Sequence, residues 1–234
     1  MKTILTLKYG EKYSADAVNS IYEHTEGKYN YVCVTDDPKG LHPDIGILYL
    51  EHEPNGNMEK LKLFQLKDLG TILYLDLDIR IQKPIDHLFD YCQDNPVIVY
   101  TWWKDKGDKQ ISIHDFPWQP EFVGPLSNYN SSIMLWKDAT HIWEHYNKYP
   151  ETYDVQYPYG DDTFLYHEGF TFEHLPHNEV YAYVAAGRKY RPEYTICLLN
   201  GLDRRPEIAK EYDELCMHQA VSYTHLTLPT IYSV

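Results

Sequence analysis

The pattern of apolar and polar residues predicts strands that alternate with helices along most of the chain. Runs rich in Ile, Leu, Val and Tyr are typical of buried strands, whereas apolar residues three or four positions apart are typical of amphipathic helices. The predicted strands are residues 2–7, 29–37, 45–50, 71–81, 95–103 and 131–137. The predicted helices are residues 14–26 with Ser14 as the capping residue, 57–70 ending at Gly70, 84–92, 139–149, and one that begins at residue 161.

This alternation predicts an α/β fold with a mostly parallel, Rossmann-like sheet and helices on both faces. Ligands of such folds bind at the carboxyl ends of the strands. Asp36, Asp37, Asp76 and Asp78 all lie at such ends. The chain has 234 residues, 43% of them apolar, and contains no internal repeat or linker. We therefore expect one domain with one sizeable core.

Composition limits the binding partners and the cellular location that we expect. The formal net charge of -14 argues against a nucleic-acid partner, which would require clustered basic residues. No apolar run is long enough to form a transmembrane segment, and the N-terminus lacks the layout of a signal peptide. Cys33 and Cys197 lie inside apolar runs, which is typical of reduced thiols buried in a core. We therefore expect a cytoplasmic protein.

Residues 221–234 differ from the rest of the chain. They resemble the translation of a transposon-end sequencing adapter read through in one frame. We therefore expect a folded domain within residues 1–220 and a non-native tail over residues 221–234. The alternative is a genuine tail with a preference for β-structure.

Two carboxylates, Asp76 and Asp78, follow the apolar residues 71–75. Residues two positions apart in a strand point the same way, so these like charges repel one another and resist burial. Because residues 79–81 continue the extended pattern, the pair is predicted to lie within a strand. Three alternatives follow: a solvated strand end, a Mg²⁺ or Mn²⁺ site, or the nucleophile site of a haloacid-dehalogenase-like phosphatase. The phosphatase motif would have Thr or Val where Arg80 stands, and it would lie near the N-terminus.

Four segments in order resemble GT-A-type glycosyltransferases, close to the glycogenin and lipopolysaccharide galactosyltransferase group. They are residues 58–89, which contain the DxD motif, 129–137, 159–166 and 195–206, and the resemblance covers residues 3–206. It implies a single GT-A-like domain and a metal-dependent glycosyltransferase. The expected partners are a nucleotide-sugar donor, with a UDP-sugar as the expected one, and a carbohydrate or glycan acceptor. The group retains anomeric configuration, so retention is expected.

The resemblance also implies roles for the residues around the DxD motif. Asp76 and Asp78 would hold Mn²⁺ or Mg²⁺, which neutralises the charge that develops on the leaving diphosphate. Lys60 would contact the diphosphate or the donor sugar, and its alternative is a solvated helix lysine. Asn130 and Ser131 would bond sugar hydroxyls, and their alternative is a hydrogen-bonded strand end.

Further roles concern the chemical step and the nucleotide. Asp161 would orient the donor or stabilise positive charge at the anomeric carbon. Asp162 is also a catalytic candidate, although the family has Gln at that position. The alternative for both is a helix start, where acids are favoured. Tyr9 would stack on the base, and Asp36 would accept hydrogen bonds from the ribose or base.

Asn200 stands where the family has a metal-binding His. An amide oxygen there would give an oxygen-rich site that favours hard ions. The alternative is a tight turn at residues 200–201.

Aromatic residues are abundant, with 23 Tyr and 5 Trp. Because sugars present apolar C–H faces, Trp102, Trp103 and Trp118 are candidates for contact with the acceptor. The alternative for most of the Tyr residues is an ordinary core or half-buried strand position. A relative that binds sugar or nucleotide without turnover remains an alternative function.

Overall fold

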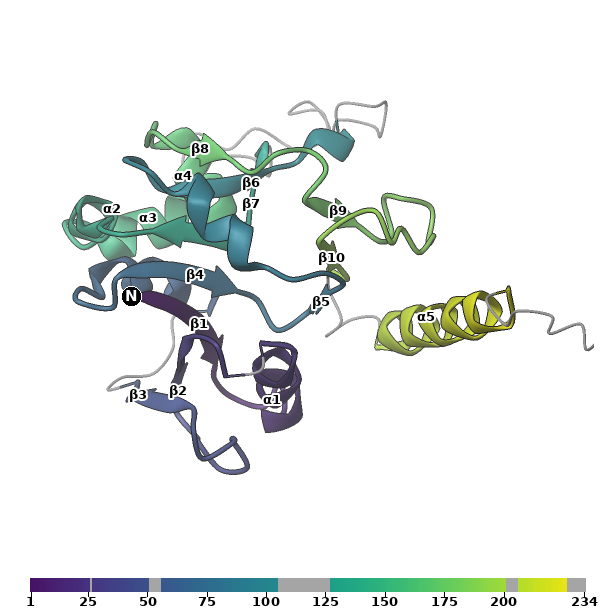
Figure 1. Cartoon of the computed structure of the whole chain (residues 1–234). Coiled ribbons are helices and arrows are strands. Elements are labelled where there is room, and N and C mark those ends of the chain that lie inside the picture. The colour runs from purple at the N-terminus through teal and green to yellow at the C-terminus, as the bar shows by residue number, and fades with distance from the viewer. Residues whose placement is uncertain (26, 51–55, 105–126, 201–205, 227–234) are drawn as a thin grey trace, which may run out of the picture.

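The computed structural model describes residues 1–25, 27–50, 56–104, 127–200 and 206–226. The strands form two sheets (Figure 1). The larger sheet has the order β3-β2-β1-β4-β7-β6-β8, and the smaller has the order β5-β10-β9. The strands are β1 (Lys2–Lys8), β2 (Asn30–Thr35), β3 (Gly46–Tyr49), β4 (Thr71–Leu75), β5 (Ile79–Ile81), β6 (Val97–Tyr100), β7 (Tyr129–Trp136), β8 (Glu173–His174), β9 (Val180–Ala182) and β10 (Ile196–Leu198).

The larger sheet is mostly parallel, as predicted. Strands β3, β2, β1 and β4 are parallel neighbours, and β6 is parallel to β8. Among the described strands of this sheet, β7 alone runs antiparallel to its neighbours, β4 and β6. The carboxyl ends of β1, β2 and β4 therefore share one edge, which is where the predicted site residues gather.

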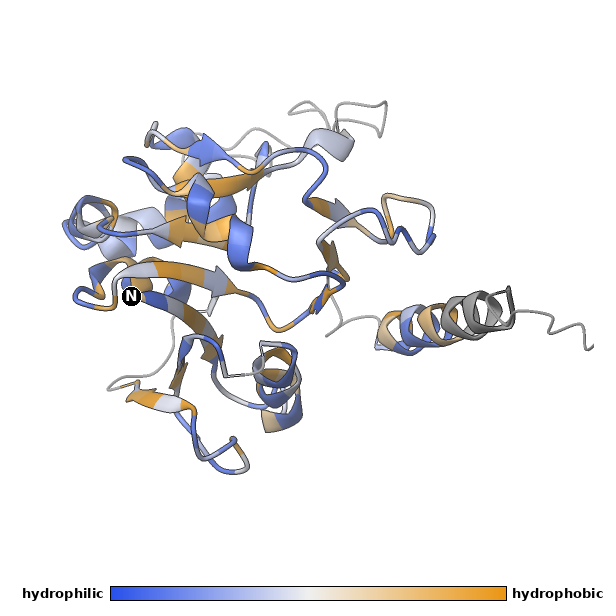
Figure 2. Cartoon of the chain, viewed as in Figure 1, coloured by the Kyte–Doolittle hydropathy of each residue, from blue (hydrophilic) through white to orange (hydrophobic). Residues whose placement is uncertain are grey.

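Helices cover both faces of this sheet (Figure 1). The helices are α1 (Ala15–His24), α2 (Thr140–Tyr146), α3 (Pro150–Gln156), α4 (Asp161–His167) and α5 (Glu207–Leu226), with the 3₁₀ helices η1 (Gly56–Gln65), η2 (Asp86–Tyr91) and η3 (Trp102–Lys104). Of these, α5 does not cover the larger sheet but packs against the smaller one. Strands in the middle of the larger sheet, such as β4, are mostly hydrophobic, whereas β8 at its edge is hydrophilic (Figure 2). Alternation along β4 sends Leu73 and Leu75 to the core on the α1 face, and Ile72 and Tyr74 to the core on the η1 face.

The predicted strand over residues 71–81 is wrong as a single element. Strand β4 ends at Leu75 in the larger sheet, whereas β5 begins at Ile79 in the smaller one. The Asp76 N–H still donates to the Ser132 carbonyl at 2.9 Å, but the Asp78 carbonyl accepts from the Leu199 N–H at 2.9 Å. The acid pair therefore lies where the chain leaves one sheet for the other, because β10 supplies a second pairing partner.

The helical predictions need three corrections. Residues 57–70 do not form an α-helix ending at Gly70, because the helix here is the 3₁₀ helix η1, which ends at Gln65. Residues 84–92 likewise contain the 3₁₀ helix η2. Ser14 does precede α1, but its side chain makes no capping hydrogen bond to the described chain, and its carbonyl accepts from the Ala17 N–H at 3.2 Å.

The C-terminal helix α5 extends to Leu226, so the backbone of residues 221–226 is helical. Residues 227–234 and Trp118 lie outside the described residues. None of the helices in the described ranges has the length and apolar character needed to cross a membrane. The four cysteines are all described and form no disulfide, and the prediction that Cys33 and Cys197 are buried thiols is confirmed.

Candidate active site

A polar cavity of about 120 Å³ opens at the carboxyl ends of β1 and β4. Five predicted site residues line it: Tyr9, Lys60, Asp76, Asp78 and Asp161. They come from the loop after β1, from η1, from the junction between β4 and β5, and from the start of α4. Residues far apart in the sequence thus converge on one point. Of the four acids predicted at strand ends, Asp76 and Asp78 line the cavity, whereas Asp36 and Asp37 do not.

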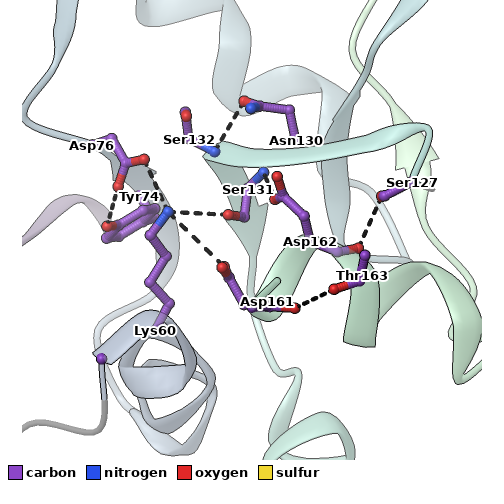
Figure 3. A network of polar contacts seen from close by, with 12 residues as sticks. Lys60, Tyr74, Asp76, Ser127, Asn130, Ser131, Ser132, Asp161, Asp162 and Thr163 are labelled. Atoms are coloured by element: carbon purple, nitrogen blue, oxygen red, sulfur yellow. Dashed lines mark hydrogen bonds and ion pairs between the residues drawn. The ribbon is translucent and has the colours of Figure 1, made fainter. Parts of the chain in front are cut away.

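Lys60 lies at the centre of this convergence (Figure 3). Its Nζ donates to Asp76 Oδ2 at 2.9 Å and to Ser131 Oγ at 3.0 Å, and it lies 3.9 Å from Asp161 Oδ2. The Lys60 side chain is only 19% exposed. The alternative of a solvated helix lysine is therefore wrong.

The charge of Lys60 is fixed by its neighbours. Burial by itself would lower the pKa of the ammonium, but the carboxylates of Asp76, Asp161 and Asp162 outweigh burial and raise that pKa. Lys60 therefore stays protonated at neutral pH. Because Lys60 lines the cavity, its ammonium can bind an anionic group such as a diphosphate there.

Asp76 is anchored through both of its oxygens. Lys60 binds Oδ2, and the Tyr74 hydroxyl donates to Oδ1 at 2.6 Å. Burial, followed by the charge of Asp76, raises the pKa of Tyr74, so this phenol remains a donor. Sequence reasoning did not single out Tyr74, although its position two residues before Asp76 was a signal that both point the same way.

Asp161 begins α4 directly after Gly160, whose φ of 98° favours glycine. The helix-start interpretation of this segment is thus confirmed, and it is compatible with a chemical role. The Asp161 side chain is buried, and its Oδ2 has no hydrogen-bond partner within the described part of the chain. Burial raises the pKa of Asp161, an effect that Lys60 opposes and Asp162 reinforces. A buried carboxylate oxygen in this position is available to a ligand.

Asp162 faces the strand rather than the cavity. Its Oδ1 accepts from the backbone N–H of Ser131 at 2.6 Å (Figure 3). Burial raises the pKa of Asp162, and Lys60 lowers it. This contact holds the start of α4 against β7, so Asp162 positions its neighbour Asp161.

Asn130 and Ser131 lie near the start of β7. The Asn130 Oδ1 accepts from the Ser132 N–H at 3.2 Å, and Ser131 Oγ accepts from Lys60. Both residues therefore form the hydrogen-bonded strand end that was the alternative interpretation. Ser131 also bonds Lys60, which lines the cavity, whereas the hydrogen bond of the Asn130 side chain stays within β7.

The loops after β1 and β2 are joined beside the cavity. Asp36 Oδ2 accepts from the Gly10 N–H at 2.9 Å, and the Tyr9 hydroxyl donates to the Gly56 carbonyl at 2.7 Å. Asp36 is exposed and does not line the cavity itself. The structure thus brings Tyr9 and Asp36 onto adjacent loops, with Tyr9 as a wall of the cavity.

No protein-family model and no curated protein sequence matches this chain. Solved structures do resemble it. The galactosyltransferase LgtC, in complex with donor and acceptor sugar analogues, has a TM-score of 0.56 at 13% identity, over 85% of this chain and 87% of LgtC. The fold is GT-A-like. An active-site mutant of LgtC has a TM-score of 0.53 at 11% identity, over 89% of this chain and 95% of that one. Mouse xyloside xylosyltransferase 1, in its apo form, has a TM-score of 0.50 at 13% identity, over 86% of this chain and 98% of that one.

Asn200 follows β10 in this GT-A-like fold. Its φ of 35° lies in the left-handed region that Asn tolerates, as the turn interpretation predicts. The preceding Leu199 N–H donates to the Asp78 carbonyl, so the chain carries Asn200 to the DxD segment. Gly201 lies outside the described residues.

The donor set suits a hard divalent ion. The cavity is lined by the carboxylates of Asp76, Asp78 and Asp161 and by two ammonium groups, those of Lys12 and Lys60, which leaves an excess of one negative charge. No group of three or more His, Cys, Asp or Glu residues in the described ranges is gathered closely enough to hold a metal by itself. Mg²⁺ typically takes one or two carboxylates, with waters and substrate phosphates completing the shell. The oxygens of Asp76 and Asp78 fit that pattern, because each carboxylate oxygen has two lone pairs.

Proposed function

We propose that this protein is a metal-dependent glycosyltransferase that moves a sugar from a UDP-sugar to a carbohydrate or glycan acceptor with retention of configuration. The observation that carries the proposal is the placement of Lys60 among Asp76, Asp161 and Ser131. A haloacid-dehalogenase-like phosphatase would have Thr or Val where Arg80 stands, and the Arg80 side chain is instead paired with Asp213 at 3.0 Å. The GT-A-like fold supports transfer over phosphate hydrolysis, although fold by itself does not establish activity.

The metal site of this proposal consists of Asp76 and Asp78, with Asn200 as a third ligand. Mn²⁺ or Mg²⁺ bound there would act as a Lewis acid that neutralises charge on the leaving diphosphate. Lys60, which bonds Asp76, would also neutralise charge on the diphosphate. Its ammonium is held in place before substrate arrives, so little reorganisation is needed when charge develops.

The donor sugar lies toward Asp161 in this proposal. The buried Oδ2 of Asp161, which accepts no hydrogen bond from the described residues, would stabilise positive charge at the anomeric carbon. Ser131 and Asn130 would bond sugar hydroxyls, and Asp162 would hold the Asp161 turn against β7. Tyr9 and Asp36, on the joined loops, would hold the base and ribose.

The test is release of UDP from a panel of UDP-sugars in the presence of MnCl₂. Lys60→Met and Asp76→Asn are expected to lower the rate at least about a hundredfold, because each removes charge stabilisation worth several kcal/mol. Lys62→Met is the matched control. Lys62 lies on the same η1 helix but pairs with Glu59 at 3.0 Å, so its loss should leave the rate within a few-fold of wild type.

Three other outcomes would redirect the assignment. Phosphate release from a phosphomonoester, abolished by Asp76→Asn, would favour the phosphatase. UDP binding without turnover of any UDP-sugar would identify a non-catalytic relative. An equal loss of UDP-release rate in Lys60→Met and Lys62→Met would show that Lys60 has a structural role rather than a functional one.

A further inference from the structure

A second cavity, of about 210 Å³, lies beside the small sheet and is lined by aromatic side chains and one arginine. Its walls include Trp102 and Trp103 of η3, Tyr181 of β9, and Tyr194 and Arg191 from the segment between β9 and β10. Four of the eight described residues that line the cavity are aromatic, and three of the others are alanines. That composition is typical of sites that take the apolar C–H face of a sugar ring.

The aromatic wall is rigid. The Trp102 indole N–H donates to the Val180 carbonyl at 3.1 Å. The Trp102 ring stacks on Tyr194 at 6.0 Å with an interplanar angle of 7°, and Trp103 stands edge-on to Trp102 at 5.7 Å. Trp103 remains half-buried, so part of its ring faces the outside. A platform fixed in this way loses little conformational entropy when a ring stacks on it.

Arg191 gives the cavity its charge. Its Nε is buried and has no hydrogen-bond partner among the residues that the structure describes. Its Nη1 lies 3.6 Å from the carboxylate of Glu193, which is 60% exposed, so this ion pair is weak. Three of the four residues 188–191 are basic in a chain whose net charge is -14. The guanidinium of Arg191 is therefore available to bind an anionic ligand.

The cavity lies within reach of the DxD segment. The Asp78 carbonyl accepts from Leu199, and the Tyr183 N–H donates to the Leu198 carbonyl. Asp78 and the end of β9 are thus separated by two strand spacings across the small sheet, which is roughly 10 Å. Ala182, at that end of β9, lines the cavity.

We propose that this cavity is an acceptor subsite for a sugar that carries an anionic group, either a carboxylate or a phosphate. The sugar ring packs on Trp103 and Tyr194, and the anion binds the guanidinium of Arg191. The proposal rests on the proposed glycosyl transfer for its role, but sugar binding here is measurable without any turnover.

The test follows the indole N–H signals of ¹⁵N-labelled protein during titration with three methyl glycosides: glucoside, glucuronide and glucoside 6-phosphate. Trp103→Phe assigns the Trp103 signal. The anionic glycosides are expected to shift the Trp102 and Trp103 signals. They should also bind at least about tenfold more tightly than the neutral one, because a hydrogen bond from Arg191 to a charged group adds that much affinity. The better of the two anions identifies carboxylate or phosphate as the natural group.

Arg191→Leu should abolish that preference and leave binding of the neutral glycoside unchanged. Arg188→Leu is the matched control, because Arg188 belongs to the same segment but pairs with Glu211 at 3.0 Å. Equal affinity for the three glycosides in the wild type would overturn the proposal, as would signals that do not shift or equal losses in both arginine variants. UDP release without acceptor, measured on the same proteins, reports separately on the proposed transfer.

Discussion

Replacing Asp161 with Asn is expected to stabilise the metal-free protein and to slow it as an enzyme. The Asp161 carboxyl is only 7% exposed, and burial raises its pKa from 3.8 to about 6 despite the nearby Lys60. Each unit of pKa difference is worth about 1.36 kcal/mol, so the ionised carboxyl destabilises the fold by on the order of 3 kcal/mol. Asn has nearly the same shape and carries no charge, so it removes this penalty.

The sign of the pH dependence follows from the raised pKa. A carboxyl whose pKa is higher in the folded state binds its proton more tightly there, so the fold gains stability as pH falls through about 6. The penalty is complete above that pH and absent below 3.8. The advantage of Asp161→Asn should therefore be largest at pH 7.5, up to about 3 kcal/mol, and should shrink toward zero near pH 4.

Urea unfolding in EDTA at pH 7.5, 6.0 and 4.5 measures this difference. Asp94→Asn is the control, because Asp94 is exposed and its replacement should change the free energy of unfolding by less than about 0.5 kcal/mol. A variant that is less stable than wild type at pH 7.5 would show that the ion pair with Lys60 outweighs burial. A gain that does not depend on pH would show that it does not arise from the charge of Asp161.

The same variant tests the chemical role. If Asp161 acts mainly in the transition state, Asp161→Asn keeps the affinity for the donor within a few-fold while turnover falls strongly. Turnover near that of wild type would reduce Asp161 to an acid at a helix start.

Three further predictions concern other parts of the chain. Asn200→Ala should weaken Mn²⁺ binding in the presence of UDP, and Asn200→His should restore it. If calorimetric titration gives the Ala variant the same Mn²⁺ affinity as wild type, Asn200 only forms a turn. Gly70→Ala should lower the free energy of unfolding by at least about 2 kcal/mol, because φ is 72° and the new Cβ would lie 2.2 Å from the Met1 carbonyl oxygen. Ending the chain at Ala220 should leave the melting temperature unchanged, and a loss of several degrees would mean that residues 221–226 pack as part of α5.

The sequence by itself determined most strands of the larger sheet and the acids that follow them, but not β8. Strands β1, β2, β3 and β7 were predicted to within a few residues, because local apolar runs report burial directly. The acids at 36, 76 and 78 were placed at strand ends for the same reason. The η1 helix was predicted as helical but not as 3₁₀, since apolar spacing does not distinguish the two hydrogen-bond patterns.

Only the tertiary structure decided which of these residues meet. The break between β4 and β5 depends on β10, which lies more than a hundred residues later, so no local pattern could reveal it. Lys60 reaches Ser131 across 71 positions, and its burial among carboxylates gives it a fixed charge that a helix pattern cannot show. The aromatic cavity around Trp103 and Arg191 likewise forms from η3 and the chain between β9 and β10. Local sequence fixes the face that each residue presents, whereas long-range strand pairing brings those faces together.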